Sequence, residues 1–121
     1  MTEIQNTKQY DLEKRTLEFA KQARMFIKKL PRNITNLEDV KQLVRSSGST
    51  GANYIEANES LSKKDFLMRI KICRKEAKES IFWLRLVDIN HNQELEKERT
   101  LLIQEATELM KIFGSIIEKS K

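Results

Sequence analysis

The stretch QLVRSSGSTGANYIEA, residues 42–57, decides the fold of this chain. Glycine, serine and threonine are dense enough within it to suggest a flexible loop. Its residues also continue a face that recurs at steps of three and four, which is the spacing of an amphipathic helix. The members of that face are Leu37, Val40, Val44, Ser47, Gly51, Tyr54 and Asn58. We therefore predict a helix that a second helix approaches closely, with a packing motif formed by Ser47, Gly51, Ala52, Asn53 and Glu56.

The composition favours one all-helical domain spanning residues 1–121. Only three glycines and one proline interrupt a chain rich in good helix formers, and 34% of its residues are charged, which suits long surface-exposed helices. The single cysteine, Cys73, has no partner for a disulfide within the chain, which favours a reducing cytoplasm. The sequence lacks both a run of about 18 apolar residues and an N-terminal secretion signal, so neither a membrane span nor export is expected.

Capping and periodicity signals divide the chain into four helices, covering about residues 11–29, 37–58, 63–88 and 93–118. Pro31 ends the first helix, because the residue before a proline is pushed out of the helical region. Short connections between consecutive helices favour antiparallel neighbours. The predicted fold is therefore an all-α, antiparallel up-down-up-down four-helix bundle. The expected N-cap residues are Asp11, Asn36 (with Asp39 three residues on), Ser62 (with Asp65) and Asn92.

Three further helical faces are predicted to form the core. On the first helix, the residues of this face are Leu12, Thr16, Phe19, Ala23, Phe26 and Leu30. On the third they are Phe66, Ile70, Cys73, Ala77, Ile81 and Leu84, and on the fourth Leu102, Ala106, Leu109, Phe113 and Ile116. Second apolar rows lie beside two of these faces, namely Phe82, Trp83, Leu86 and Ile89, and Ile103, Met110 and Ile117. Because solvated apolar rows are costly, at about 25 cal/mol per Å², we predict a second contact surface and a homo-oligomer.

No arrangement of residues points to catalysis or to a cofactor. Residues 48–51 lack the lysine and the preceding strand of a phosphate-binding loop. His91 is the only histidine and is expected in a solvated turn, while Cys73 is expected in the core. Four glutamates could in principle meet as a carboxylate metal site, but the Glu-x-x-His pairs of di-metal bundles are missing. These glutamates are Glu56, Glu59, Glu76 and Glu79. We therefore predict a protein that is not an enzyme and has no metal or cofactor.

A cationic stripe on the third helix is the strongest candidate for a functional surface. Lys64, Lys71, Lys78 and Arg85 recur every seven residues over roughly 30 Å, with Arg74 between them. One interpretation is a solvated face whose charges pair with glutamates of neighbouring helices. The other is a surface that follows a phosphate backbone and reads charge and shape rather than bases. The first helix has a shorter version of this stripe in Lys14, Lys21, Arg24 and Lys28.

The chain also resembles a known bacterial family, the S23 ribosomal protein or 23S rRNA intervening-sequence proteins. The resemblance covers about residues 8–120. In the second helix it rests on Gln42-Leu43, Arg45-Ser46, Ser49, Gly51-Ala52-Asn53 and Glu56-Ala57. It continues through Ser62, Asp65-Phe66, Lys75-Glu76-Ala77, Glu79-Ser80 and Phe82-Trp83-Leu84, and ends with Glu105, Glu108-Leu109 and the region of Ile112.

This resemblance implies an antiparallel four-helix bundle that assembles into a ring, expected to be a homopentamer. It also implies a relation to the accessory variability protein of diversity-generating retroelements. That protein forms a basic pentameric barrel and associates with a reverse transcriptase and nucleic acid. The family brings no catalytic residues to this chain, and its biochemical role is poorly defined.

Two functions follow as hypotheses. The first is a non-enzymatic, cytoplasmic homo-oligomer that binds RNA or DNA through Lys64, Lys71, Arg74, Lys78 and Arg85. The alternative is a ring-forming structural scaffold, or a subunit that docks a partner protein such as a reverse transcriptase, with no nucleic-acid role. The two differ in whether the basic stripe faces solvent in the assembly.

Overall fold

Four α-helices make up the protein. The computed structural model describes the backbone of residues 2–121 and the side chains of residues 12–121. The helices are α1 (Thr2–Lys28), α2 (Ile34–Asn58), α3 (Lys63–Leu86) and α4 (Gln93–Lys119). Because α1 begins at Thr2, the prediction that Asp11 is its N-cap is wrong, and the Asp11 side chain itself lies outside the described residues.

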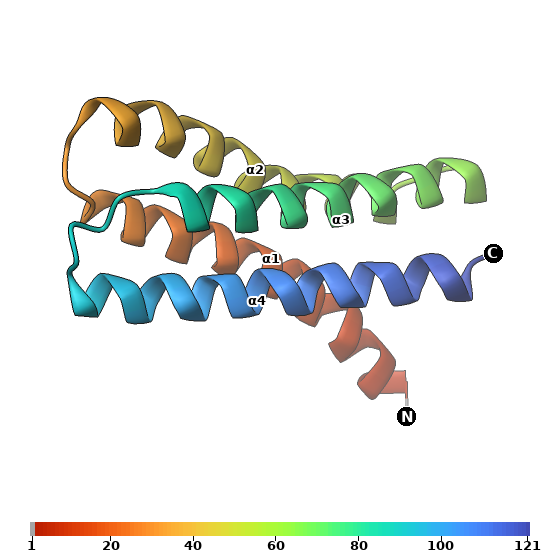
Figure 1. The fold of residues 1–121 in the computed structure, drawn as a ribbon. Helices are drawn as coiled ribbons and strands as arrows, with labels where there is room; N and C mark the ends of the chain where they lie inside the picture. The colour runs from red at the N-terminus through yellow and green to blue at the C-terminus, as the bar shows by residue number, and fades with distance from the viewer. Residues whose placement is uncertain (1) are drawn as a thin grey trace.

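The helices form the predicted up-down-up-down bundle. Figure 1 shows that the α1–α2 and α3–α4 connections lie at one end, whereas the α2–α3 connection lies at the other end with the C-terminus. Each helix packs against the next in the chain, and α1 also packs against α4. Packing is most extensive between α2 and α3 and least extensive between α1 and α4.

Side chains cap three of the helices, and two of these caps were predicted. The Ser62 side chain accepts a hydrogen bond from the Asp65 amide, and the Asn92 side chain accepts one from the Leu95 amide. For α2, however, the cap is Asn33, whose Oδ1 accepts from the Asn36 amide at 2.9 Å. The helix therefore begins at Ile34 rather than at residue 37.

Asn36, expected to be that cap, instead ties two connections together. Its side chain is inside the protein, with only 2% of the residue exposed. Its Nδ2 donates to the carbonyl oxygens of Pro31 at 3.0 Å and of Asp88 at 2.9 Å. Its Oδ1 accepts from the Asp88 amide at 2.9 Å. One asparagine thus joins the α1–α2 connection, the first turn of α2 and the segment after α3.

The predicted core face of α1 is confirmed, since all six of its residues are buried. On α2 the buried face is wider than predicted and turned toward α3, because this helix packs between α1 and α3. Leu37 of the predicted face is exposed, and Leu43, Ser46, Thr50 and Ala57 are buried in addition. On α3 and α4, Phe66, Ile81 and Ile116 are only partly buried, and the other members of the predicted faces are buried.

The second apolar rows are largely absorbed by the protein's own core. Ile117 and Ile89 are buried, while Ile103 and Trp83 pack against the buried cluster. These rows lie toward neighbouring helices of the bundle rather than away from it. The argument for a homo-oligomer that rested on them therefore loses most of its basis, although Phe82 and Leu86 of the same rows remain exposed.

The small residues of α2 do allow a close helix approach, as predicted. A Cβ atom added to Gly51 would lie 2.8 Å from Thr16 Oγ1 of α1, closer than side chains can pack. On the side facing α3, a hydrogen bond of 2.8 Å joins Ser46 Oγ and Ser80 Oγ. Of the predicted packing motif, Ser47 and Gly51 are buried and Asn53 is half-buried. Ala52 and Glu56 are exposed and do not line the crossing.

Candidate nucleic-acid interface

The cationic stripe lies on an exposed face of α3, away from its buried residues. Positions seven apart on an α-helix drift by about 20° per step, so the stripe runs nearly along the helix axis. Figure 1 shows α3 at the outside of the bundle, beside α4. All five predicted residues are exposed: Lys64, Lys71, Arg74, Lys78 and Arg85. Sequence periodicity therefore placed this set on one solvent-facing surface.

The five stripe cations make no ion pair with any described side chain. The cations that pair with another helix are Arg15 of α1, Lys29 just after α1, and Arg45 of α2. Arg15 pairs with Glu105 at 2.7 Å, Lys29 with Glu98 at 3.0 Å, and Arg45 with two glutamates of α3. The remaining pairs are short-range contacts within one helix or at the C-terminus. Within residues 12–121, the interpretation that neighbouring glutamates neutralise the stripe is therefore not supported.

An aromatic residue interrupts the stripe near its C-terminal end. Phe82 is 56% exposed, and its ring meets that of Trp83 edge to face, with centroids 4.9 Å apart and an interplanar angle of 80°. The Trp83 Nε1–H donates a hydrogen bond to Glu79 Oε2 at 2.9 Å. The exposed face of α3 therefore combines unpaired cations with an accessible ring.

Ion pairs from Arg45 of α2 to two glutamates of α3, one buried and one partly exposed, join the two helices next to Trp83. The Arg45 guanidinium donates to Glu76 Oε1 at 3.0 Å and to Glu79 Oε2. The hydrogen bonds from Trp83 and from Arg45 hold the pKa of the Glu79 carboxyl below its usual value, despite some desolvation. The same pairing, led by the bond to Glu79, raises the pKa of Arg45. Glu79 is therefore a carboxylate at neutral pH and stays in contact with both donors.

The Glu79–Trp83 bond has a spacing signal in the sequence, since positions four apart on a helix are neighbours. The Arg45–Glu79 contact has none, because it joins residues 34 positions apart on separate helices. Sequence reasoning considered Glu79 only as a metal ligand and missed its role beside Phe82.

Among the described side chains, no group of three or more His, Cys, Asp and Glu residues is placed to hold a metal ion. Of the four glutamates considered for a metal, Glu76 and Glu79 are held by Arg45, whereas Glu56 and Glu59 are exposed on α2 and its C-cap. Burial raises the pKa of the Cys73 thiol to about 12, so it is not a nucleophile at neutral pH.

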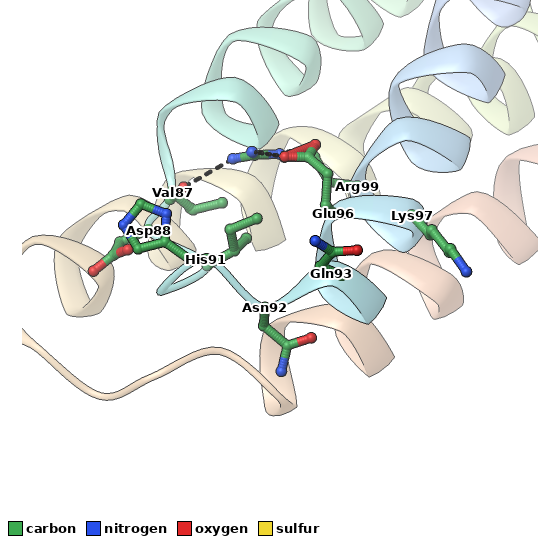
Figure 2. Close-up of a pocket in the computed structure, with 9 residues that line it drawn as sticks. Val87, Asp88, His91, Asn92, Gln93, Glu96, Lys97 and Arg99 are labelled. Atoms are coloured by element: carbon green, nitrogen blue, oxygen red, sulfur yellow. Dashed lines mark hydrogen bonds and ion pairs between the residues drawn. The ribbon is translucent and has the colours of Figure 1, made fainter.

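His91 lies in the predicted turn, beside an open hollow of about 670 Å³. Asn90 and His91 adopt positive φ values of 53° and 57°, and the Asn92 amide closes the turn on the Ile89 carbonyl at 3.1 Å. Figure 2 shows Arg99 extending to the Val87 carbonyl and to Glu96, while Lys97 points away from that pair. Of the polar groups that line the hollow, Arg99 bonds to Glu96 and to the Val87 carbonyl, and the Asn92 side chain accepts from the Leu95 amide.

Comparisons with known proteins agree on one family. A family profile described as "23S rRNA-intervening sequence protein" matches residues 8–115. A crystal structure of a protein with unknown function from the S23 ribosomal protein family of Bacteroides thetaiotaomicron is 32% identical and superposes with a TM-score of 0.79. That alignment covers 92% of this chain and 98% of the other.

No curated protein matches the sequence. Within the described residues, no helix has both the length and the apolar content to cross a membrane. The family profile spans most of the chain, and the solved relative shares its fold over nearly its whole length. The chain therefore belongs to the 23S rRNA-intervening sequence protein family, the S23 ribosomal protein family of its solved relative.

Proposed function

We propose that the protein binds RNA or DNA through the outward face of α3, without catalysing a reaction. The observation that carries this proposal is the row of five exposed cations, none of which forms an ion pair with a described side chain. Together with Lys121, Arg74 is the one of the five that lowers the pKa of a described carboxyl, that of Glu118. A helix face with this much uncompensated charge attracts polyanions, and each phosphate that it neutralises releases a counterion. Contacts of this kind position a nucleic acid but do not read its sequence.

The stripe predicts how strongly affinity depends on salt. If all five cations contact phosphates, the logarithm of the association constant falls with the logarithm of salt concentration with a slope of about −4.5 for a duplex. Binding should be weak at physiological salt for one subunit. It becomes effective when several copies of the stripe act together.

A titration of two double variants tests the proposal. Fluorescence anisotropy is measured for a labelled RNA hairpin and a DNA duplex across a salt series. Lys71→Glu with Lys78→Glu should weaken binding to both and reduce the salt slope by about 2. The control, Lys41→Glu with Lys97→Glu, makes the same change in net charge on α2 and α4. Equal weakening by both pairs, or no binding by the wild type at low salt, would refute a nucleic-acid interface on α3.

We also propose that the protein is a cytoplasmic homo-oligomer, for which the family resemblance suggests a pentamer. Support comes from an apolar hollow of about 320 Å³ between α1 and α2. Leu17 and Ile55 line it and are 54% and 51% exposed. Contiguous exposed apolar surface of this kind is typical of subunit contacts. A structural scaffold without a nucleic-acid role is the second candidate function, and the same hollow favours it.

A further inference from the structure

Phe82 is an unusual residue to find exposed near the C-terminal end of a cationic helix face. More than half of it is accessible, at 56%. Lys78 precedes it by four positions and Arg85 follows it by three, so both lie on the same helix surface, about 5–6 Å away between Cβ atoms. Neither cation forms an ion pair with a described side chain. A flat apolar ring thus lies between two charges that are free to contact anions.

The ring is held in place by a chain of contacts that begins on α2. Arg45 bonds to Glu79, Glu79 accepts from Trp83 Nε1, and the Trp83 ring meets Phe82 edge to face at 4.9 Å. Phe82 nevertheless stays 56% exposed, so the residue remains accessible to a ligand. An aromatic ring fixed in this way loses little conformational freedom when a flat ligand stacks on it.

The chemistry that fits this surface is a flat, uncharged ring joined to anionic groups on both sides. An unpaired nucleotide within a strand has this form, since its base stacks on aromatic side chains while the flanking phosphates contact Lys or Arg. A base inside a duplex is already stacked and paired, so it reaches Phe82 only at the cost of unstacking.

We propose that Phe82 is a stacking site for an unpaired nucleobase, with Lys78 and Arg85 contacting the neighbouring phosphates. α3 therefore binds single-stranded RNA or DNA in preference to duplex. This inference rests on the proposed nucleic-acid function and adds to it the class of nucleic acid. A subunit contact is the competing use of Phe82. Such a contact would also have to cover Lys78 and Arg85, and burying unpaired charges is costly.

Binding of matched single-stranded and duplex oligonucleotides tests the proposal, with RNA and DNA forms of each. Phe82→Leu keeps apolar surface but removes the ring, and should weaken single-strand binding about tenfold or more while leaving duplex binding unchanged. Phe82→Tyr keeps the ring and should bind as the wild type does. Leu101→Ala, at an exposed apolar position on α4, is the control and should change neither affinity.

Trp83 supplies a second, independent measurement because it is the only tryptophan in the chain. A base that stacks on Phe82 arrives next to the Trp83 ring, so single-stranded oligonucleotides should change its fluorescence emission. Duplexes bound through phosphates alone should leave the emission nearly constant. Comparison of the RNA and DNA strands shows which backbone the site accepts.

The outcomes separate this inference from the function on which it rests. If the wild type binds no nucleic acid at low salt, both fail. If it binds strand and duplex equally, and Phe82→Leu changes neither affinity, stacking is refuted while the phosphate interface stands. If Phe82→Ala lowers the mass of the oligomer in light scattering, Phe82 belongs to a subunit contact and the stacking site is refuted.

Discussion

At the scale of single residues, the two glycines of α2 have opposite roles. Gly51 faces Thr16, whose side chain is buried and donates a hydrogen bond to the Leu12 carbonyl at 2.8 Å, so it has little freedom to move away. Gly48, one turn earlier, is different. A Cβ atom there would meet only the end of the flexible Arg24 side chain at 3.5 Å, which is an ordinary contact.

The same substitution should therefore change stability in opposite directions at the two sites. Gly51→Ala forces α1 and α2 apart, and overpacking of this kind costs about 1–3 kcal/mol, more than the helix propensity that alanine adds. Gly48→Ala should instead stabilise the protein by about 0.5–1 kcal/mol, because it only reduces the entropy of the unfolded chain. Urea unfolding of the two variants measures both effects. A stabilised Gly51→Ala variant would contradict the close crossing.

Spacing in the sequence identified Gly51 as a close-contact residue, because a glycine on the buried face of a continuous helix leaves room for a neighbouring backbone. It could not identify Thr16 as the partner, since no periodicity links residues on different helices. Asn36 was assigned the wrong role for a related reason. A helix start offers several capping residues within three positions, and only the fold determines that Asn36 meets Asp88.

At the scale of elements, Asn33 and Asn36 secure the same end of the bundle in different ways. Asn33 caps α2 and also donates from Nδ2 to Asp88 Oδ2 at 3.1 Å, in a setting that water can reach. Asn36 is itself buried and makes two part-buried bonds to the Asp88 backbone and a third to the Pro31 carbonyl. Removing its side chain takes the partner from three backbone groups at once, which costs more than the loss of one exposed bond.

Asn36→Ala should therefore destabilise the protein more than Asn33→Ala does. We expect a loss of about 2–3 kcal/mol for Asn36→Ala. Loss of the N-cap in Asn33→Ala should cost about 1 kcal/mol. Thermal and urea unfolding give both values. Equal losses of stability in the two variants would show that water replaces the Asn36 side chain at Asp88. The hydrogen bonds of Asn36 would then contribute no more to stability than an ordinary N-cap does.

The ion pair between Arg45 of α2 and Glu79 of α3 should also make the stability of the protein depend on pH. The pKa of Glu79 in the folded protein is below its usual 4.5, so the unfolded chain takes up this proton first as the pH falls. The stability that the carboxylate contributes is present above about pH 4.5 and is lost as the pH falls through the folded pKa. Urea unfolding at pH 7 and pH 3.5 should show this loss.

The variant Glu79→Gln isolates that contribution. Glutamine still accepts from Trp83 Nε1 but carries no charge for Arg45, so the variant should be less stable at pH 7 and lose less stability on acidification. Other carboxyl groups with lowered pKa values, such as Glu96 and Glu118, are common to both proteins and cancel in the comparison. An identical pH dependence in wild type and variant would contradict the assignment.

The number and order of the helices were predictable from the sequence, but the starts of α1 and α2 and the width of each buried face were not. The single stripe expected on α2 is correct for a helix that packs on one side. This helix packs against α1 through Gly51 and against α3 through Ser46, so its buried face is wider. The second row of α4 was interpreted as a subunit contact for the same reason. Ile103 and Ile117 pack within the protein's own core.

At the scale of the whole molecule, the exposed apolar side chains are unevenly placed. Leu17 and Ile55 come together in the hollow between α1 and α2, whereas Leu61, which is 98% exposed, lies outside that hollow in the connection between α2 and α3. Isolated exposed apolar residues are common on protein surfaces, but a contiguous patch suggests a partner surface.

A charged residue in the hollow should therefore dissociate the proposed oligomer. Static light scattering of the wild type should give a multiple of the monomer mass at micromolar concentration. Ile55→Asp should reduce that mass, because it places a charge in an apolar contact. Leu61→Asp is the control and should leave the mass unchanged. A monomeric wild type would refute the oligomer, and an unaffected Ile55→Asp variant would place the contact elsewhere.

For the candidate interface, the seven-residue spacing sufficed to place four cations on one face, and Arg74, three residues after Lys71, is exposed with them. Whether those cations are neutralised was not predictable, because it depends on which glutamates the neighbouring helices bring near. The glutamates of α4 at positions 98, 105 and 108 pair with Lys29 and Arg15, and the two central glutamates of α3 pair with Arg45. These five acids are therefore engaged by cations outside the stripe.

The close packing of α2 against α1 and against α3 also bears on how sequences of this family change over generations. At Ser46, Gly51 and Ser80 the helix backbones lie so near one another that almost any replacement is larger than the space available. The seam between α1 and α4 is looser and is bridged by long side chains such as Arg15, whose partners are exchangeable. Inherited substitutions should therefore accumulate quickly on the outer faces of α1 and α4. The small residues of α2 should be among the last to change.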